Sequence, residues 1–303
     1  MTRVLVTGAS GFIGRHSLPA LIERGYEVHA VAREARTVPV TAGVTTHACD
    51  LFDDRATAAL VERVRPSHLL HFAWYAVPGR FWTAPENLDW VAASLRLVRA
   101  FAGVGGRRVV VAGSCAEYDW SYATLSEIAT PLAPRTLYGT AKDALRRCLE
   151  RAAPDLGLSW AWGRIFFVYG PHEPAGRLIS SVLGDLLAGR RAAVSSGVQR
   201  RDFMHAEDVA RAFVATLDRP VEGALNIASG QAVTVREVVE RIGTLTGQTA
   251  LIDFGARPAP ADEPPCLLAD ISALRGAVGF TPCYGLASGL EQTVDWWQRA
   301  RRD

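Results

Sequence analysis

Short apolar runs alternate with longer amphipathic stretches through the first half of the chain. Apolar residues gather at positions 3–7, 27–31, 69–72 and 107–112, and helix-like stretches such as 16–24 lie between them. Strands that alternate with helices in this way become parallel neighbours, with helices on both faces of the sheet. The pattern therefore predicts an α/β fold with a doubly wound parallel sheet.

The pattern changes after about residue 165. Proline and glycine interrupt the chain at 170–176, and there follow a helix-like run at 178–188, a strand-like run at 223–227 and a proline-rich segment at 258–265. We therefore expect a first domain over residues 1–165 and a smaller domain over residues 166–303, with some segments returning to the first sheet. Ligands of open α/β sheets bind at the carboxyl ends of the strands, so the second domain is expected to cover that edge.

Composition indicates a folded protein with a large core. The chain has 303 residues, of which 49% are hydrophobic, and a net charge of +2 from 33 basic and 31 acidic residues. It shows no long basic run and no apolar stretch of the roughly 20 residues that span a bilayer, so we expect neither nucleic acid nor membrane as a partner. Met1 leads directly into the first apolar run, and we expect no cleaved signal.

Five cysteines are scattered through the chain, at positions 49, 115, 148, 266 and 283, without Cys-x-x-Cys spacing. Isolated cysteines of this kind are typical of reduced proteins without structural zinc. We therefore predict a cytoplasmic protein and no metal site.

A glycine-rich loop follows the first apolar run directly. It reads Gly8-Ala9-Ser10-Gly11-Phe12-Ile13-Gly14 and leads into the helix-like stretch. Glycines at this spacing allow a tight turn and let the backbone approach a pyrophosphate, whose charge then lies at the helix N-terminus. The sequence therefore predicts a dinucleotide site formed by Gly8, Ser10, Gly11, Phe12, Ile13 and Gly14.

Lys142 is the single lysine among the 33 basic residues. A chain that uses arginine almost everywhere keeps lysine where a planar guanidinium cannot replace a compact ammonium. Tyr138 lies four residues earlier, which places both side chains on one face of a helix. An ammonium beside a phenol stabilises the phenolate, so we expect the pKa of Tyr138 to be lowered from about 10 toward neutrality, as general acid–base catalysis requires. Chance could also produce this spacing, so the assignment depends on the glycine loop as well.

The glycine loop and the Tyr-x-x-x-Lys motif together resemble the extended short-chain dehydrogenase/reductase family, which contains nucleotide-sugar epimerases, dehydratases and reductases. Further matches cover essentially the whole chain, namely Asp50-Leu51, His71-Phe72-Ala73-Trp74, 109–114, 164–171, Arg201-Asp202-Phe203-Met204-His205 and Gly289-Leu290 with Trp296. The resemblance implies a Rossmann-type sheet with a smaller C-terminal substrate-binding domain. It also implies a catalytic triad in which Ser114 binds the reacting oxygen, Tyr138 transfers a proton and Lys142 binds the nicotinamide ribose.

The resemblance also assigns the cofactor contacts. Beyond the glycine loop they are Arg33, Asp50, Leu51, Phe72, Ala73, Trp74, Tyr138 and Lys142. Arg33 follows Ala32 at the end of the second strand, where an NAD site usually has Asp or Glu and where an arginine accommodates the 2′-phosphate of NADP. We therefore expect NADP(H) to be favoured over NAD(H), although Arg33 could simply be solvated.

The expected substrate contacts are Ser114, Cys115, Trp74, Arg201 and Phe167. Arg201 matches a family arginine that binds the substrate diphosphate, a task suited to a guanidinium. Phe167 stands where relatives often have Asn. The 4,6-dehydratases of this family carry an Asp-Glu pair where this chain has Cys115-Ala116, so we expect no dehydration.

Three functions fit these residues. The leading hypothesis is NADPH-dependent reduction of a nucleotide-linked 4-keto-6-deoxy sugar by the triad. The alternative is a nucleotide-sugar 4-epimerase that uses the same triad with tightly bound NAD. Under a third hypothesis the protein is a non-catalytic NADP-binding regulator, but such a protein has no need to keep the three triad residues together. As in relatives, we expect a homodimer through the helices around 90–101 and 138–149, with Leu95, Val98 and Leu145 on the contact face.

Overall fold

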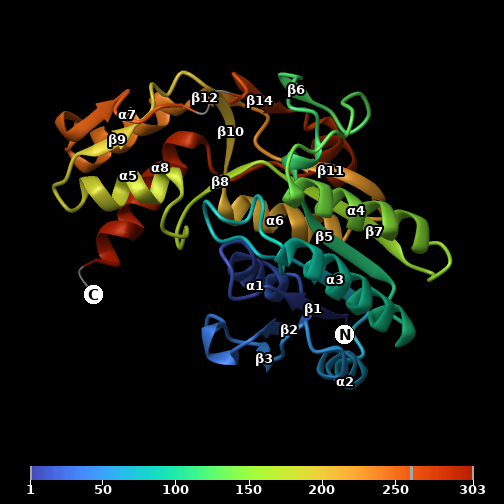
Figure 1. Ribbon diagram of the computed structural model, residues 1–303. Coiled ribbons are helices and arrows are strands. Elements are labelled where there is room, and N and C mark those ends of the chain that lie inside the picture. The colour runs from blue at the N-terminus through green and yellow to red at the C-terminus, as the bar shows by residue number, and fades with distance from the viewer. Residues whose placement is uncertain (1, 260–261, 302–303) are drawn as a thin grey trace.

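A seven-stranded parallel sheet forms the centre of the fold (Figure 1). The computed structural model describes residues 2–259 and 262–301. The sheet has the order β11-β7-β5-β4-β1-β2-β3. Its strands are β1 Arg3–Thr7, β2 Glu27–Ala32, β3 Val44–Ala48, β4 His68–His71, β5 Arg108–Ser114, β7 Ser159–Ile165 and β11 Gly223–Ile227. The chain starts in the middle, adds β2 and β3 on one side and then crosses to β4, so the topological switch point lies between β1 and β4.

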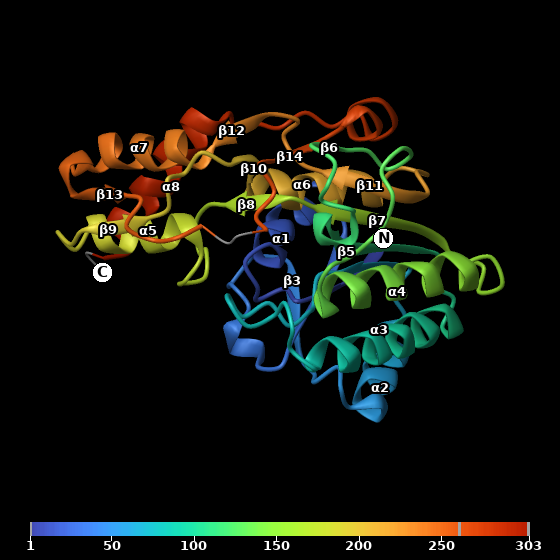
Figure 2. The same cartoon turned by 45° about the horizontal axis from the view of Figure 1, so that its top comes forward.

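Helices cover both faces of this sheet (Figure 2). The covering helices are α1 Gly14–Glu23, α2 Asp54–Val64, α3 Glu86–Gly103, α4 Leu137–Ala152 and α6 Ala206–Leu217. α1 and α6 pack against Val4 and Val6 of β1, whereas α2, α3 and α4 share a core with Leu5 of the same strand. Burial of both faces explains why the strands read as continuous apolar runs.

The remaining elements form a smaller lobe. Its strands are β6 Thr124–Leu125, β8 Phe167–Tyr169, β9 Ala192–Val194, β10 Arg200–His205, β12 Ala232–Thr234, β13 Ile252–Phe254 and β14 Cys266–Ala269. β12, β10, β14 and β6 form one sheet with β8 beside β10, and β9 pairs with β13. Its helices are α5 Leu178–Leu186, α7 Val235–Thr246 and α8 Leu286–Arg299. The short helical turns are divided between the two parts: η1 Ala35–Thr37 packs against β2 and β3, η2 Cys115–Glu117 against α4, η3 Thr249–Leu251 against α7, and η4 Leu274–Val278 against α6 and β11. The second half of the chain thus builds most of this lobe, to which the first half contributes β6, and it also contributes β11 and α6 to the central layer.

Most predicted elements are found within two residues of their expected bounds. The strand-like run 223–227 coincides with β11, and the helix expected at 16–24 begins earlier, at Gly14. Residues 260 and 261 of the proline-rich segment lie outside the described residues. No helix in the described part of the chain is long and apolar enough to cross a membrane.

The apolar residues expected at a dimer interface lie inside the monomer. Val98 of α3 and Leu145 of α4 are buried in the core beneath the central sheet, and Leu95 packs against the same core. The expectation that these three residues form a free contact face was therefore wrong. Their apolar stripe faces the sheet, because the sheet needs a covering helix layer on this side.

Candidate active site

The glycine loop joins β1 to α1 in a conformation that requires glycine. Gly8 has a φ of +68°, and a Cβ there would lie 2.7 Å from the backbone nitrogen of Ala73. A Cβ on Gly14 would lie 2.2 Å from the carbonyl oxygen of Gly8. The first turn of α1 has no side-chain cap and no acidic residue. Its backbone amides can therefore bind a pyrophosphate, and the loop fits a dinucleotide.

The three residues of the expected triad come together at the carboxyl end of β5. Ser114 ends this strand, and Tyr138 and Lys142 lie in the first two turns of α4, whose N-terminus is capped by the Thr136 hydroxyl. The Nζ of Lys142 donates to the carbonyl oxygen of Ala112 at 2.7 Å. The same atom lies 6.0 Å from the ring centroid of Tyr138. The helical spacing read from the sequence thus brings the ammonium close to the phenol.

The expected lowering of the Tyr138 pKa is not found in the protein alone. Burial raises the pKa of Tyr138 to about 12, against the effect of a hydrogen bond with Ser114. Burial also lowers the pKa of Lys142 to about 7, and the charge of Glu117 opposes that shift. Burial disfavours the charged form of each group, and it is the largest influence on both pKa values. The Tyr-x-x-x-Lys spacing predicts that the two side chains are neighbours, but it does not predict how deeply they are buried.

Aromatic side chains surround the phenol of Tyr138. The rings of Phe81 and Trp82 meet it edge to face, at centroid distances of 4.9 Å and 5.8 Å. The backbone nitrogen of Tyr138 also donates to the carbonyl oxygen of Trp82 at 3.1 Å. Sequence reasoning did not select Phe81, because only the folded chain brings this loop onto α4. This packing restricts the position of the phenol ring.

Trp74 connects the cofactor segments to the triad. This residue follows β4 with Phe72 and Ala73, and the backbone of these two residues lies against Gly8. The Nζ of Lys142 stands 3.7 Å from the centroid of the Trp74 ring. Phe72, Ala73 and Trp74 therefore lie between the glycine loop and the triad, as expected for cofactor contacts.

Arg33 and Asp50 lie at the carboxyl ends of neighbouring strands. Arg33 follows β2 and is exposed, while Asp50 and the buried Leu51 follow β3, which pairs with β2 in parallel. Within residues 2–259 and 262–301, no ion pair is found for Arg33, whereas Arg36 pairs with Glu34 at 2.7 Å. Arg33 is therefore placed to meet a ligand at this edge of the sheet.

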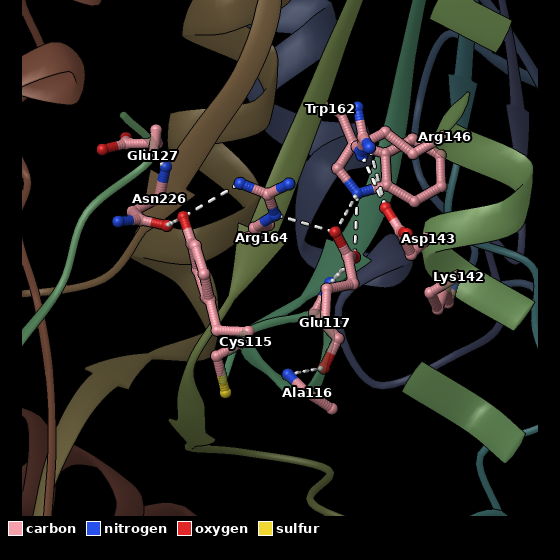
Figure 3. A network of polar contacts seen from close by, with 12 residues as sticks. Cys115, Ala116, Glu117, Glu127, Lys142, Asp143, Arg146, Trp162, Arg164 and Asn226 are labelled. Atoms are coloured by element: carbon pink, nitrogen blue, oxygen red, sulfur yellow. Dashed lines mark hydrogen bonds and ion pairs between the residues drawn. The ribbon is translucent and has the colours of Figure 1, made fainter. Parts of the chain in front are cut away.

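Sequence reasoning did not select one buried carboxylate, which lies beside Trp162 and Arg164 (Figure 3). Glu117 is fully buried. It accepts hydrogen bonds from the backbone nitrogen of Ser114 at 2.7 Å, from Nε1 of Trp162 at 2.9 Å and from Nε of Arg164 at 2.7 Å. Arg164 was expected only as part of a family segment, and the structure places it as the partner of this acid.

Arg201 and Phe167 lie together in the smaller lobe. The guanidinium of Arg201 is buried, 5.4 Å from the Phe167 ring centroid, and its Nη2 pairs with Glu263 at 2.8 Å. The positive charge of Arg201 lowers the pKa of the Cys115 thiol, which burial raises to about 12. The expected substrate residues Cys115, Phe167 and Arg201 are thus close to one another, although Glu263 already occupies one side of the arginine.

Arg177 is a further residue that sequence reasoning missed. Its guanidinium lies 5.7 Å from the ring centroid of Phe12 in the glycine loop, and its charge lowers the pKa of Tyr138 against the larger effect of burial. It also lines a cavity of about 260 Å³ between α5 and β9, together with Arg257 and Glu263. Arg177 therefore stands between the cofactor loop, the phenol and a cavity in the smaller lobe.

A cavity of about 770 Å³ lies at the opposite end of the central strands. Arg3 and Arg108 line it, and β5 runs from Arg108 to Ser114, so the triad is at the far end of that strand. These arginines bind helix ends: Arg3 donates to the carbonyl oxygen of Val64 at 2.6 Å, and Arg108 donates to that of Thr216 at 2.7 Å. Cations at helix C-termini stabilise the fold, so we assign this cavity no part in the chemistry.

No cluster of three or more metal-ligating side chains is found in the part of the chain that the structure describes. The site described above is therefore built from a glycine cradle, a triad and several arginines. Features of these kinds suit binding of a phosphate-bearing ligand or proton transfer.

Comparison with known proteins places this site in a family. The model of the NAD dependent epimerase/dehydratase family matches residues 4–228. The chain therefore belongs to this family, within the extended short-chain dehydrogenase/reductase group. UDP-glucose 4-epimerase of Azospirillum brasilense is 29% identical, over 98% of this chain and 92% of that protein.

Two further comparisons give the range of relatives. The dTDP-6-deoxy-L-talose 4-dehydrogenase (NAD(P)(+)) of Kitasatospora kifunensis is 27% identical, over 92% of this chain and 91% of that protein. The solved structure of MoeE5 in complex with UDP-glucose and NAD is 33% identical, covers 99% of each chain and has a TM-score of 0.84. Two of these relatives are named as a nucleotide-sugar 4-epimerase and a nucleotide-sugar 4-dehydrogenase, and several solved neighbours are complexes with NAD.

Proposed function

We propose that the protein is a nucleotide-sugar 4-epimerase that acts with tightly bound NAD. The observation that supports this most strongly is the 33% identity, over 99% of each chain, to a protein that binds UDP-glucose and NAD. The glycine cradle at Gly8 and Gly14 and the assembled triad suit the same chemistry. The comparisons thus favour the alternative reading of the sequence over reduction of a 4-keto sugar.

Each triad residue has a defined task in this proposal. Ser114 hydrogen-bonds the oxygen at C4 of the hexose, and Tyr138 takes the proton from that oxygen and later returns it. Lys142 binds the ribose and, in its ammonium form, lowers the pKa of the phenol, because an opposite charge favours the phenolate. The glycine loop at Gly8 and Gly14 would hold NAD, and the bound cofactor would supply a reversible hydride acceptor for C4 of the sugar.

The nucleotide and diphosphate of the substrate are proposed to lie beside the smaller lobe. Arg177 and Arg257 line the cavity between α5 and β9, and guanidinium groups suit a diphosphate. Arg201 is next to this cavity through its partner Glu263. Movement of Glu263 would allow Arg201 to bind the same diphosphate.

Reduction of a nucleotide-linked 4-keto-6-deoxy sugar by NADPH is the second candidate function. It is supported by the exposed Arg33 at the end of β2 and by the 27% identity to a 4-dehydrogenase named for both NAD and NADP. The two functions differ in the cofactor that should copurify and in whether it is consumed.

The test compares these functions directly. The purified protein is incubated with UDP-glucose, and separately with UDP-glucuronic acid, without added nicotinamide cofactor, and the C4 epimers are followed by proton NMR. Epimer formation in wild type and its loss in Tyr138→Phe are expected. If no epimer forms while a nucleotide-linked 4-keto sugar oxidises added NADPH, the reductase is the correct assignment. Mass analysis of the cofactor released on denaturation distinguishes NAD from NADP independently.

We also propose a homodimer and a cytoplasmic location. α3 and α4 lie side by side at the surface (Figure 2), and Leu88 of α3 is 60% exposed. A second copy of the chain is the proposed partner of this exposed helix surface. All five cysteines are free, which suits a reducing compartment.

A further inference from the structure

Glu117 is held at its position by three residues from two strands, β5 and β7. It receives hydrogen bonds from β5 through the Ser114 nitrogen and from β7 through Trp162 and Arg164. A carboxylate with no solvent exposure is costly in free energy unless it is paired and its oxygens are hydrogen-bonded. Here both conditions are met, so this acid can remain ionised inside the protein.

The surrounding backbone leaves room for this carboxylate and for little else. A Cβ on Gly113 would lie 2.7 Å from Oε1 of Glu117 and 2.0 Å from Nε1 of Trp162. On the other side, a Cβ on Gly139 of α4 would lie 2.3 Å from the carbonyl oxygen of Ala116. α4 thus packs directly on the turn that contains Glu117. The carboxylate fixes this turn through its hydrogen bond with the Ser114 nitrogen. The turn then supports α4, the helix that carries Tyr138 and Lys142.

The charge of Glu117 reaches both reacting groups of the triad. It opposes the burial that lowers the pKa of Lys142, and it adds to the burial that raises the pKa of Tyr138. The other ionisable groups near this carboxylate are Cys115 and Tyr118 beside it, Arg164 on β7, and Glu127, which interacts electrostatically with Tyr118 and Arg164. Among these groups Arg164 makes the ion pair with Glu117, at 2.7 Å.

The same network continues away from the triad (Figure 3). Nη1 of Arg164 donates to the Tyr118 hydroxyl at 2.9 Å, and this hydroxyl donates to Oδ1 of Asn226 at 2.8 Å. Asn226 in turn donates to the carbonyl oxygens of Leu125 and Asp270. The partner of Glu117 is therefore fixed by β11 and by segments next to the smaller lobe, which limits movement of the carboxylate.

We propose that Glu117 is a positioning residue of this active site: its buried carboxylate fixes the backbone of Ser114 and places a negative charge in the turn against which the helix of Lys142 packs. The proposal rests on the proposed function, since it concerns the same triad. The proposed role of Glu117 differs from that of a purely structural ion pair in one respect. A structural pair would stabilise the fold without altering the protonation of Lys142.

The single lysine of the chain permits a direct test. Protein that contains lysine labelled with ¹³C at Cε gives one side-chain signal, that of Lys142, and its titration can be followed by NMR. Glu117→Gln should shift the midpoint to lower pH by about one unit, because an opposite charge has been removed. It should also lower kcat by about tenfold or more through loss of the fixed Ser114 geometry.

Two further variants distinguish an effect of the Glu117 charge from an effect on folding. Glu117→Asp keeps the charge but shortens the side chain, so we expect the wild-type midpoint with a reduced kcat. Glu117→Gln combined with Arg164→Met removes both buried charges, and it should still show the lower midpoint even if Glu117→Gln alone does not fold. Asp208→Asn is the matched control, because Asp208 is also fully buried but accepts from the backbone of Cys283 and Tyr284. It should leave the Lys142 midpoint unchanged.

The outcomes decide between the two roles. A wild-type midpoint in folded Glu117→Gln, or in the double variant, would overturn the proposal. So would a shifted midpoint with wild-type kcat at every pH. If the wild-type protein converts no nucleotide sugar, the proposed function fails, while the titration still decides whether Glu117 controls the protonation of Lys142.

Discussion

The ammonium of Lys142 lies 3.7 Å from the centroid of the Trp74 ring and donates to the Ala112 carbonyl oxygen on its other side. The indole is itself fixed, because its Nε1 donates to Oδ1 of Asn87 at 2.8 Å. A compact cation between a ring face and a carbonyl group gains from both contacts. This geometry explains why an arginine-rich chain has its lysine here.

Lys142→Arg should therefore remove nearly all activity although the positive charge remains. The planar guanidinium is larger than the space between Trp74 and Ala112, and it cannot bind the ribose as a point charge. The rate and the pH profile of kcat should be measured beside those of Arg147→Lys, an exposed change on the same helix. A normal rate with an unshifted profile would mean that the position of the single lysine is accidental.

Tyr138→Phe should remove at least about 99% of turnover, because general acid–base groups typically contribute 10²- to 10⁴-fold. The ring remains packed against Phe81 and Trp82, so cofactor binding should be intact when measured on the isolated protein. Tyr122→Phe changes an exposed phenol and serves as the control. Turnover of Tyr138→Phe within about threefold of wild type would exclude this residue as the proton carrier.

Arg33→Ala should weaken binding of NADPH by roughly tenfold to a hundredfold and barely affect NADH. A guanidinium paired with the 2′-phosphate is worth about 1.5 to 3 kcal/mol. Arg36→Ala is the control, since Arg36 already pairs with Glu34. Adding Ala32→Asp to Arg33→Ala should reverse the preference by supplying an acceptor for the free ribose hydroxyl and a charge that repels the phosphate. If Arg33→Ala weakens the binding of NADPH and NADH equally, Arg33 does not contact the 2′-phosphate.

Glu173 makes the stability of the protein depend on pH. Burial raises the pKa of Glu173 from 4.5 to about 7, against the charge of Arg177 and a hydrogen bond from the Ser180 nitrogen. Between these values the folded protein keeps a proton that the unfolded chain has lost. The resulting stabilisation is complete below pH 4.5 and is lost as the pH rises to about 7.

Glu173→Gln should therefore raise the Tm at pH 8 by about 5 °C and leave it nearly unchanged at pH 4.5. The amide keeps an oxygen for the Ser180 nitrogen and carries no charge. Glu222→Gln, at an exposed position, controls for the general effect of removing a carboxylate. The same Tm difference at both pH values would show that the carboxyl of Glu173 ionises as it does in the unfolded chain.

Light scattering at micromolar concentration should give the mass of a dimer, twice the 32.7 kDa of one chain. Because Val98 and Leu145 are buried within the monomer, the contact must use the outer faces of α3 and α4. Leu88→Asp should shift the equilibrium toward monomer by placing a charge on that surface. Wild-type protein that is monomeric throughout this range would contradict the proposal.

The sequence predicted the parts of the molecule that depend on local patterns. The strand Gly223–Ile227 and the glycine loop were read from apolar spacing and from glycine positions, and the Tyr138 and Lys142 pair from helical periodicity. The start of α1 was placed too late, because Gly14 is a poor helix former but is held there by its packing against Gly8.

The sequence did not predict features that arise from long-range contacts. Glu117 gains its role from Trp162 and Arg164, which lie 45 and 47 residues away. Phe81 and Arg177 reach Tyr138 only through the folded loops. The direction of the Tyr138 pKa was wrong for the same reason, since burial is decided by tertiary packing and not by the spacing of two residues.

Because Lys142 is buried, the opening of α4 can be measured. Lys142 is the one lysine of the chain and is 3% exposed, so a protease that cleaves only after lysine has no accessible site in the folded protein. Cleavage yields fragments 1–142 and 143–303 and requires α4 to leave the sheet. Its rate therefore reports how often the catalytic helix opens. A bound dinucleotide or sugar nucleotide should slow that cut in proportion to its affinity.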